Sequence, residues 1–151
     1  MKERNMSVQV IEELDASVEV VWDLVGNFGG LKRWNPFISE CLCQGEGVGA
    51  LRTVKTPEGR ETIEQVDALD PEGHLLDYRV VSMRPATPMV GMRVTLRLDA
   101  MSPDRTRLTW TGRLAQPLAD AESLYAGIGA GFRSRIEALR NALVVQAQRE
   151  S

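Results

Sequence analysis

Two residues have side chains and positions that would suit acid–base chemistry. Tyr78 alternates in phase with Leu76 and Val80, so its ring should lie on the covered face of a strand, where its hydroxyl needs a partner or a ligand. Glu64 could act as a general base only if it were buried with a raised pKa. Because a buried, isolated carboxylate is costly, we expect Glu64 to be solvated or salt-bridged. No catalytic set is defined, and Tyr78 and Glu64 are the only candidates.

The two cysteines and the single histidine do not make a recognisable metal or nucleophile site. Cys41 and Cys43 would point to one face of a strand, and we expect both to be reduced and half-buried. His74 follows a Pro-Glu-Gly turn and is expected to be exposed. No serine or cysteine has a phase that would complete a triad. Zinc would need more ligands, so the sequence predicts neither a metal nor a cofactor.

Composition limits the classes of protein that are compatible with this chain. With 151 residues, 43% of them hydrophobic and 26% charged, residues 1–151 should form a single domain with its own core. The net charge of −3 and the scattered basic residues disfavour binding to nucleic acid. No run approaches the roughly 18 apolar residues that span a bilayer, and residues 1–6 lack an apolar signal segment. We therefore expect no membrane span and a cytoplasmic location.

In the C-terminal part of the chain, apolar residues repeat at helical spacing, and the face that they form must pack against the rest of the protein. The repeat predicts one long amphipathic helix from Asp120 to Ala147. Its first half contains Gly127, Gly129 and Gly131, each of which costs about 0.8–1 kcal/mol relative to alanine inside a helix. Space beside the helix would explain this cost. The apolar positions are Leu124, Ile128, Phe132, Ile136, Leu139 and Leu143.

The rest of the chain predicts strands and two short helices. A first strand over 8–14 is followed by a helix that Ser17 would cap and that ends by Gly26, and then by one more turn over 31–34, after the break at Gly29-Gly30. Short alternating segments separated by turn residues then indicate an antiparallel meander. A seven-stranded antiparallel sheet and a long helix, each with one apolar face, favour an α+β fold in which the sheet curls around the helix. The six later strands are expected over 38–44, 50–55, 61–69, 75–82, 91–100 and 105–114.

This order of elements resembles the START-like superfamily, also called Bet v 1-like or SRPBCC, and within it the bacterial polyketide cyclase/dehydrase-like branch. The resemblance covers residues 8–143 and rests on the order and spacing of short motifs rather than on a catalytic signature. It implies the helix-grip fold, which plant pollen allergens and abscisic acid receptors share, with a deep apolar cavity between helix and sheet. The motifs are Ser17-Val-Glu-Val-Val-Trp22, Trp34-Asn-Pro36, Gly47-Val-Gly-Ala-Leu-Arg52, Glu64-Gln-Val-Asp-Ala-Leu-Asp70, Tyr78-Arg79 and Leu108-Thr-Trp110.

The implied cavity gives a set of candidate ligand contacts. Aromatic and aliphatic residues of the covered sheet face and of the helix would line it, although plain core packing is the alternative for each of them. Near the entrance, Met83, Met89 and Met92 would make an adaptable mouth. The sequence does not tell whether Arg52 and Glu64 face the cavity, whereas Arg79 should point outward. The candidates are Trp34, Phe37, Tyr78, Leu96, Leu108, Trp110, Tyr125, Ile128 and Phe132.

Three functions are compatible with such a cavity. The first is non-covalent binding of a small hydrophobic ligand, by a carrier, a sensor or a sequestering protein. The alternative is a cyclase/dehydrase-like enzyme that positions a poly-β-ketone for aldol closure. The third is a regulatory protein that presents Trp34 or Met89 to a partner, and a homodimer is also left open. Two or more ionisable groups that converge near Tyr78 would favour catalysis, and a wholly apolar cavity would favour binding.

Overall fold

The computed structural model describes residues 7–116 and 121–150 and has the predicted α+β architecture. Seven antiparallel strands form one sheet in the order β1-β7-β6-β5-β4-β3-β2. Two short helices, α1 (Val18–Val25) and η2 (Phe28–Arg33), follow the first strand, and the long α2 (Ala121–Glu150) closes the chain. The strands are β1 (Ser7–Leu14), β2 (Glu40–Gln44), β3 (Leu51–Lys55), β4 (Glu61–Asp70), β5 (Leu75–Arg84), β6 (Arg93–Ser102) and β7 (Arg105–Arg113).

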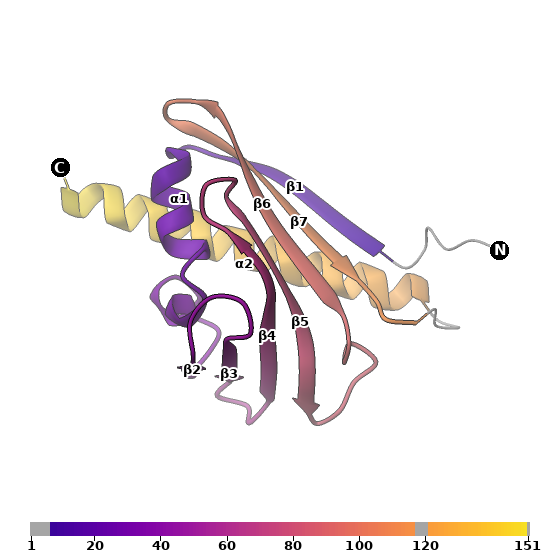
Figure 1. Cartoon of the computed structure of the whole chain (residues 1–151). Coiled ribbons are helices and arrows are strands. Elements are labelled where there is room, and N and C mark those ends of the chain that lie inside the picture. Colours follow the sequence, from indigo (N-terminus) through magenta and orange to yellow (C-terminus); the bar gives the residue numbers. More distant parts are fainter. Residues whose placement is uncertain (1–6, 117–120, 151) are drawn as a thin grey trace.

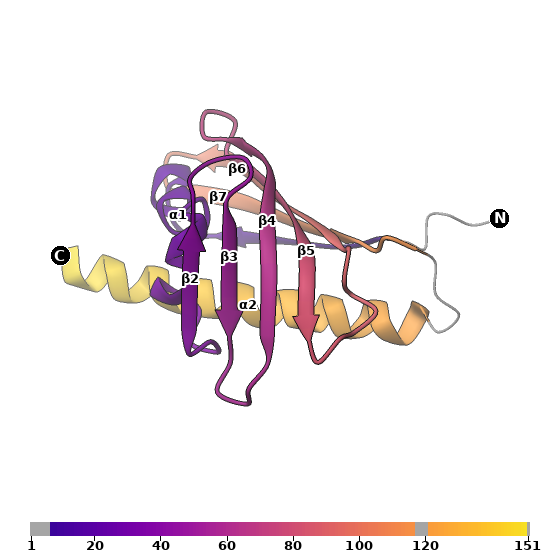
Figure 2. The same ribbon diagram turned by 60° about the horizontal axis from the view of Figure 1, so that its bottom comes forward.

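The sheet curls strongly, and α2 lies along its concave side. In Figure 1, β1, β6 and β7 run obliquely over the helix, and Figure 2 shows β2 to β5 crossing it more steeply. Arg140 ties α2 to the first strand through hydrogen bonds from its Nη1 to the Glu13 carbonyl oxygen (2.7 Å) and from its Nη2 to Glu12 (2.9 Å). Beyond Phe132, Ile136 and Leu139 are almost fully buried, so this half of the helix closes the core.

Several expected boundaries differ from the structure. The second strand begins at Glu40 rather than at residue 38, and the sixth begins at Arg93, because Gly91 (φ +92°) belongs to a turn. The break expected at Gly29-Gly30 is a kink within η2, where Gly30 has a non-helical backbone conformation (φ −97°, ψ 22°). A Cβ at Gly29 would lie 2.9 Å from the Cβ of Cys43, so this close approach of η2 to β2 requires glycine. The proposed N-cap, Asp120, lies outside the described residues.

The prediction for His74 was wrong. His74 is half-buried, and its ring packs edge-on against Trp22 with the ring centroids 5.7 Å apart. It also has a left-handed backbone conformation (φ 55°). A turn residue can thus be covered when an element distant in the sequence, here α1, packs over it. Of the two cysteines, Cys41 is half-buried as expected, whereas Cys43 is exposed.

Candidate functional site

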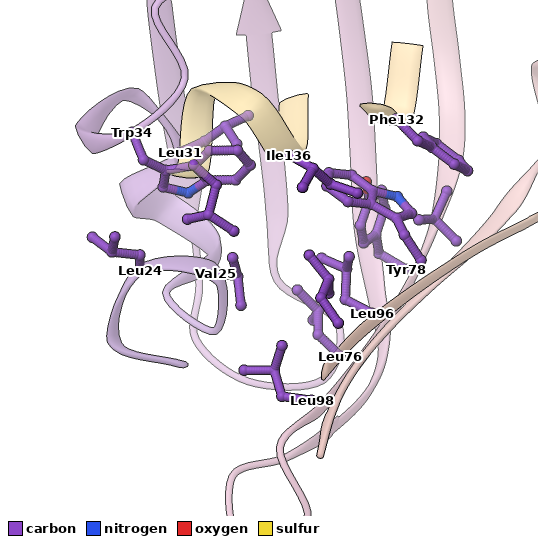
Figure 3. Packing of buried hydrophobic residues seen from close by; sticks show 14 of the residues in the cluster. Leu24, Val25, Leu31, Trp34, Leu76, Tyr78, Leu96, Leu98, Phe132 and Ile136 are labelled. Carbon is purple, nitrogen blue, oxygen red and sulfur yellow. The ribbon is translucent and has the colours of Figure 1, made fainter. Parts of the chain in front are cut away.

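A cavity of about 550 Å³ lies between the first half of α2 and the concave face of the sheet. Figure 3 shows Trp34 and Leu31 on one side of this interior and Tyr78, Leu96 and Phe132 on the other. Every lining residue that α2 contributes falls within residues 123–135. The two halves of the helix therefore differ in role, since the N-terminal half faces open space and the C-terminal half packs against the core.

Two sequence periods place the apolar lining residues. On the sheet, alternation directs every second residue inward, and the pairing of Leu76 with Leu96 and of Leu96 with Trp110 sets three such residues side by side. On α2, positions three or four apart share the face toward the cavity. Gly127 and Gly131 are among them, and a Cβ at Gly127 would meet nothing within 4 Å. Gly129 instead packs near Val8, so only two of the three glycines leave room in the cavity.

The structure brings most of the candidate ligand contacts together. Phe37 is half exposed (53%) and lies at the rim, whereas the other candidates that line the cavity are buried. Trp110 stacks on Phe132 with the ring centroids 5.0 Å apart and meets Trp34 edge-on at 6.5 Å. Whether these residues touch a ligand stays a prediction. The candidates that line the cavity are Trp34, Phe37, Tyr78, Leu96, Trp110, Ile128 and Phe132.

Two candidates do not line the cavity. Leu108 is fully buried two residues from Trp110 on β7, pairs with Leu98 and belongs to the core. Tyr125 is half-buried on α2, but a helix turns by about 100° per residue, so it lies off the face that Leu124 and Ile128 share. Its hydroxyl is buried, and among the described residues it has no hydrogen-bond partner.

Inside the cavity, Arg52 and Glu64 form an ion pair that the sequence did not locate. The Nε of Arg52 donates to Oε1 of Glu64 over 2.6 Å, and its Nη1 donates to the carbonyl oxygen of Phe28 over 2.9 Å. The guanidinium also lies over the rings of Phe28 and Tyr78, at 4.1 and 4.9 Å from their centroids. Glu64 is thus salt-bridged, one of the two states expected. The alternation Ala50, Arg52, Val54 is the signal that could have placed Arg52 inward.

This cluster sets the protonation state of Tyr78. Burial, reinforced by the negative charge of Glu64, raises the pKa of Tyr78 to about 12, and the charges of Arg52 and Arg135 offset part of the effect. Burial acts most strongly on the pKa of Arg52 and would lower it, but the interactions of the guanidinium with Glu64, Tyr78 and Cys41 together raise the pKa above its ordinary value. At neutral pH, Tyr78 is therefore a neutral phenol that can donate a hydrogen bond, and Arg52 is a cation balanced by Glu64.

The other residues singled out from the sequence are Arg79, the three methionines and Trp34, which the third functional hypothesis had assigned to a protein partner. Arg79 points outward as expected and bonds to Gln65 over 2.9 Å. The three methionines line the cavity at its loop side, where the Thr87 hydroxyl lies 3.0 Å from the Met83 sulfur. Trp34 is 5% exposed, so it does not present a surface to a protein partner in this conformation.

Within residues 7–116 and 121–150 no three His, Cys, Asp or Glu side chains gather as metal ligands would. None of the helices in the same part of the chain is both long and apolar enough to cross a bilayer.

The sequence and the fold are both similar to those of known proteins. The profile of the family described as "Polyketide cyclase / dehydrase and lipid transport" matches residues 5–144. The abscisic acid receptor PYL7 of Arabidopsis thaliana is 30% identical over 84 residues, which are 53% of this chain but only 40% of that receptor. The solved structure of the protein XoxI from Bacillus cereus has a TM-score of 0.80 at 19% identity and covers 91% of this chain and 95% of its own.

A Zhui aromatase/cyclase from a Streptomyces species has a TM-score of 0.70 at 20% identity, and the alignment covers 95% of this chain and 93% of the cyclase. At this identity the two solved structures share the fold. The abscisic acid receptor is similar to this chain in sequence as well, over about half of the chain.

Proposed function

Because the chain belongs to the polyketide cyclase / dehydrase and lipid transport family, we propose that it binds a small, mainly hydrophobic molecule between α2 and the sheet. The observation that carries the proposal is the cavity itself, which at about 550 Å³ has the size of ligand pockets and is lined mainly by apolar side chains. Residues 1–151 would act as one ligand-binding domain, in the cytoplasm of a bacterium, as a carrier, sensor or sequestering protein.

Uptake of a neutral fluorescent probe tests this proposal directly. We expect N-phenyl-1-naphthylamine to bind with saturable, one-to-one stoichiometry and with a blue-shifted emission, because the side chains that line the cavity are mainly apolar. Native mass spectrometry of the purified protein would show any ligand that the protein retains from its host. A fluorescence response that rises linearly with probe concentration, without saturation, would contradict the proposal.

A second candidate function is a cyclase/dehydrase-like reaction, and one observation favours it. Arg52, Glu64 and Tyr78 converge inside the cavity, so its interior is not wholly apolar. In an aldol closure, Glu64 would remove a proton from a carbon between two carbonyl groups. The neutral Tyr78 would donate its proton to the oxygen of the attacked carbonyl, and Arg52 would stabilise the enolate. The enolate carbon would attack that second carbonyl carbon, and the carbon–carbon bond so formed closes the ring. The Tyr78 phenolate would then take the second proton from the same carbon and Glu64 would return its proton to the new hydroxyl group, so that water leaves, a double bond forms and both residues are restored.

This reaction can be tested apart from binding. A poly-β-ketone thioester should give more cyclised, dehydrated product with the protein than in buffer, measured by liquid chromatography and mass spectrometry. Tyr78→Phe and Glu64→Gln should both abolish the excess while the neutral probe still binds. Product yields equal to those in buffer would leave binding as the function of the cavity.

A further inference from the structure

The charges that line the cavity are unbalanced. Of the residues that the structure describes, three arginines and one glutamate line its wall, although the protein as a whole carries a net charge of −3. Arg52 is neutralised by Glu64, and the pair lies in the interior. Arg60 and Arg135 are exposed and yet line the cavity, which places both at its rim. The rim is therefore cationic in an acidic protein.

Neither of the two rim arginines has an ionic partner within the described part of the chain. By contrast, many other arginines on the surface pair with carboxylates, for example Arg79 with Asp67, Arg93 with Asp77 and Arg105 with Glu13. Among residues 7–116 and 121–150 the ion pairs include neither Arg60 nor Arg135. Their charge is thus available to a ligand.

The two arginines reach the rim from different elements. Arg60 immediately precedes β4, next to Glu61, whereas Arg135 comes from α2. The Nη1 of Arg135 lies 3.7 Å from the position of a Cβ at Gly131, so the guanidinium folds back over a lining residue that has no side chain. Its charge also acts on the buried hydroxyl of Tyr78. Arg135 is therefore directed toward the cavity.

We propose that the cavity selects apolar molecules that end in an anionic group, held at the rim by Arg60 and Arg135 with the apolar body inside. This inference rests on the proposed binding function and names the class of ligand. The orientation follows from desolvation, since an anionic group at the exposed rim keeps part of its hydration, whereas one taken inside would lose it. In the interior, the charges of Arg52 and Glu64 cancel and give an anion no net attraction.

Three eight-carbon probes that differ only in their head group test the charge preference. In isothermal titration calorimetry at pH 7.4, octanoate should bind roughly tenfold more tightly than 1-octanol, because each exposed arginine contributes roughly two- to five-fold. Octylamine should bind more weakly than the alcohol. Raising the salt concentration from 20 to 500 mM should reduce the octanoate affinity toward that of the alcohol and leave the alcohol unchanged.

Substitution of single arginines tests whether Arg60 and Arg135 cause the preference for octanoate. Arg60→Gln and Arg135→Gln should each lower octanoate affinity roughly two- to five-fold without affecting 1-octanol. Arg133→Gln is the matched control, because Arg133 is exposed on the same helix but does not line the cavity. Equal affinity for octanoate and 1-octanol, with no effect of salt, would overturn the ligand class while leaving the binding function intact. Binding of none of the three probes would overturn both.

Discussion

The Nε of Arg52 and Oε1 of Glu64 lie 2.6 Å apart on the neighbouring strands β3 and β4, inside a cavity that is otherwise mainly apolar. Both side chains are largely removed from water, with 6% and 14% of their surfaces exposed. Each buried charge is therefore stable mainly because the other is present. The ion pair makes one polar site in the wall of the cavity and adds no net charge to it.

Removal of one member of this pair should destabilise the protein strongly. Glu64→Ala leaves the Arg52 guanidinium buried without its counter-ion, and we expect the free energy of unfolding to fall by about 3–5 kcal/mol. In the double variant Arg52→Met/Glu64→Leu neither charge remains, so the loss should be less than half as large. Urea denaturation of the three proteins gives these values. A double variant as unstable as Glu64→Ala would show that packing, rather than charge, explains the loss.

Alkaline pH should destabilise the protein through Tyr78. In the unfolded chain a tyrosine has a pKa of about 10, whereas burial raises the pKa of Tyr78 to about 12 in the folded protein. Between these values the folded form keeps a proton that the unfolded form has lost. The stabilising contribution is therefore complete below pH 10 and disappears as the pH rises to about 12, a loss of about 2–3 kcal/mol.

The pH effect can be measured on a single tyrosine. The sequence contains only two, so Tyr125→Phe leaves Tyr78 as the sole phenol for an ultraviolet titration. Its absorbance change should occur well above pH 10, and Tyr78→Phe should flatten the dependence of stability on pH in this range. An ordinary titration near pH 10 in the folded Tyr125→Phe protein would contradict the burial of the hydroxyl.

Filling the space beside α2 should block uptake of hydrophobic probes. Gly127 lines the cavity and a Cβ there would meet nothing within 4 Å, so we expect the side chain of Gly127→Leu to occupy part of the cavity and to lower the affinity for N-phenyl-1-naphthylamine severalfold. It should not unfold the protein, because leucine favours helix over glycine by about 0.5–1 kcal/mol. Ala126→Leu adds bulk to an exposed neighbour that does not line the cavity and is the control. Equal uptake by the two variants would mean that the probe binds elsewhere.

The contact between Gly112 and Phe132 should be intolerant of added volume. A Cβ at Gly112 would lie 2.9 Å from Cζ of Phe132, whose ring is held by its stacking on Trp110. Gly112→Ala should therefore cost about 1–3 kcal/mol, as overpacking does in other cores. In a Phe132→Leu background, where the ring is absent, the same substitution should cost much less. Thermal denaturation of the four proteins completes the cycle, and purely additive losses would exclude this steric explanation.

Much of the fold follows from local patterns in the sequence. The alternation of Leu76, Tyr78 and Val80 predicted the covered face of a strand, and Tyr78 is buried there. The spacing of Leu124, Ile128 and Phe132 predicted a helical face, and all three line the cavity. These predictions hold because the side-chain period of a strand or helix depends on neighbouring residues alone.

The extent of the site was not predictable in the same way. Leu108 and Trp110 share a face of β7, but only Trp110 lies where the strand passes the open half of α2. The pairing of Arg52 with Glu64 joins residues 12 positions apart through the register of β3 and β4. The repeat of a strand or helix gives the direction in which a side chain points. How close that side chain lies to a helix distant in the sequence depends on how the sheet curls.

The sequence by itself thus determined the α+β architecture, the order of its elements and the inward-facing residues, because these depend on local periodicity and turn chemistry. Only the tertiary structure decided which inward residues border open space, that two opposite charges meet inside it and that two arginines without an ionic partner among the described residues lie at its rim. Those relationships arise from contacts between elements far apart in the chain, and their distances are set by the packing of the whole domain.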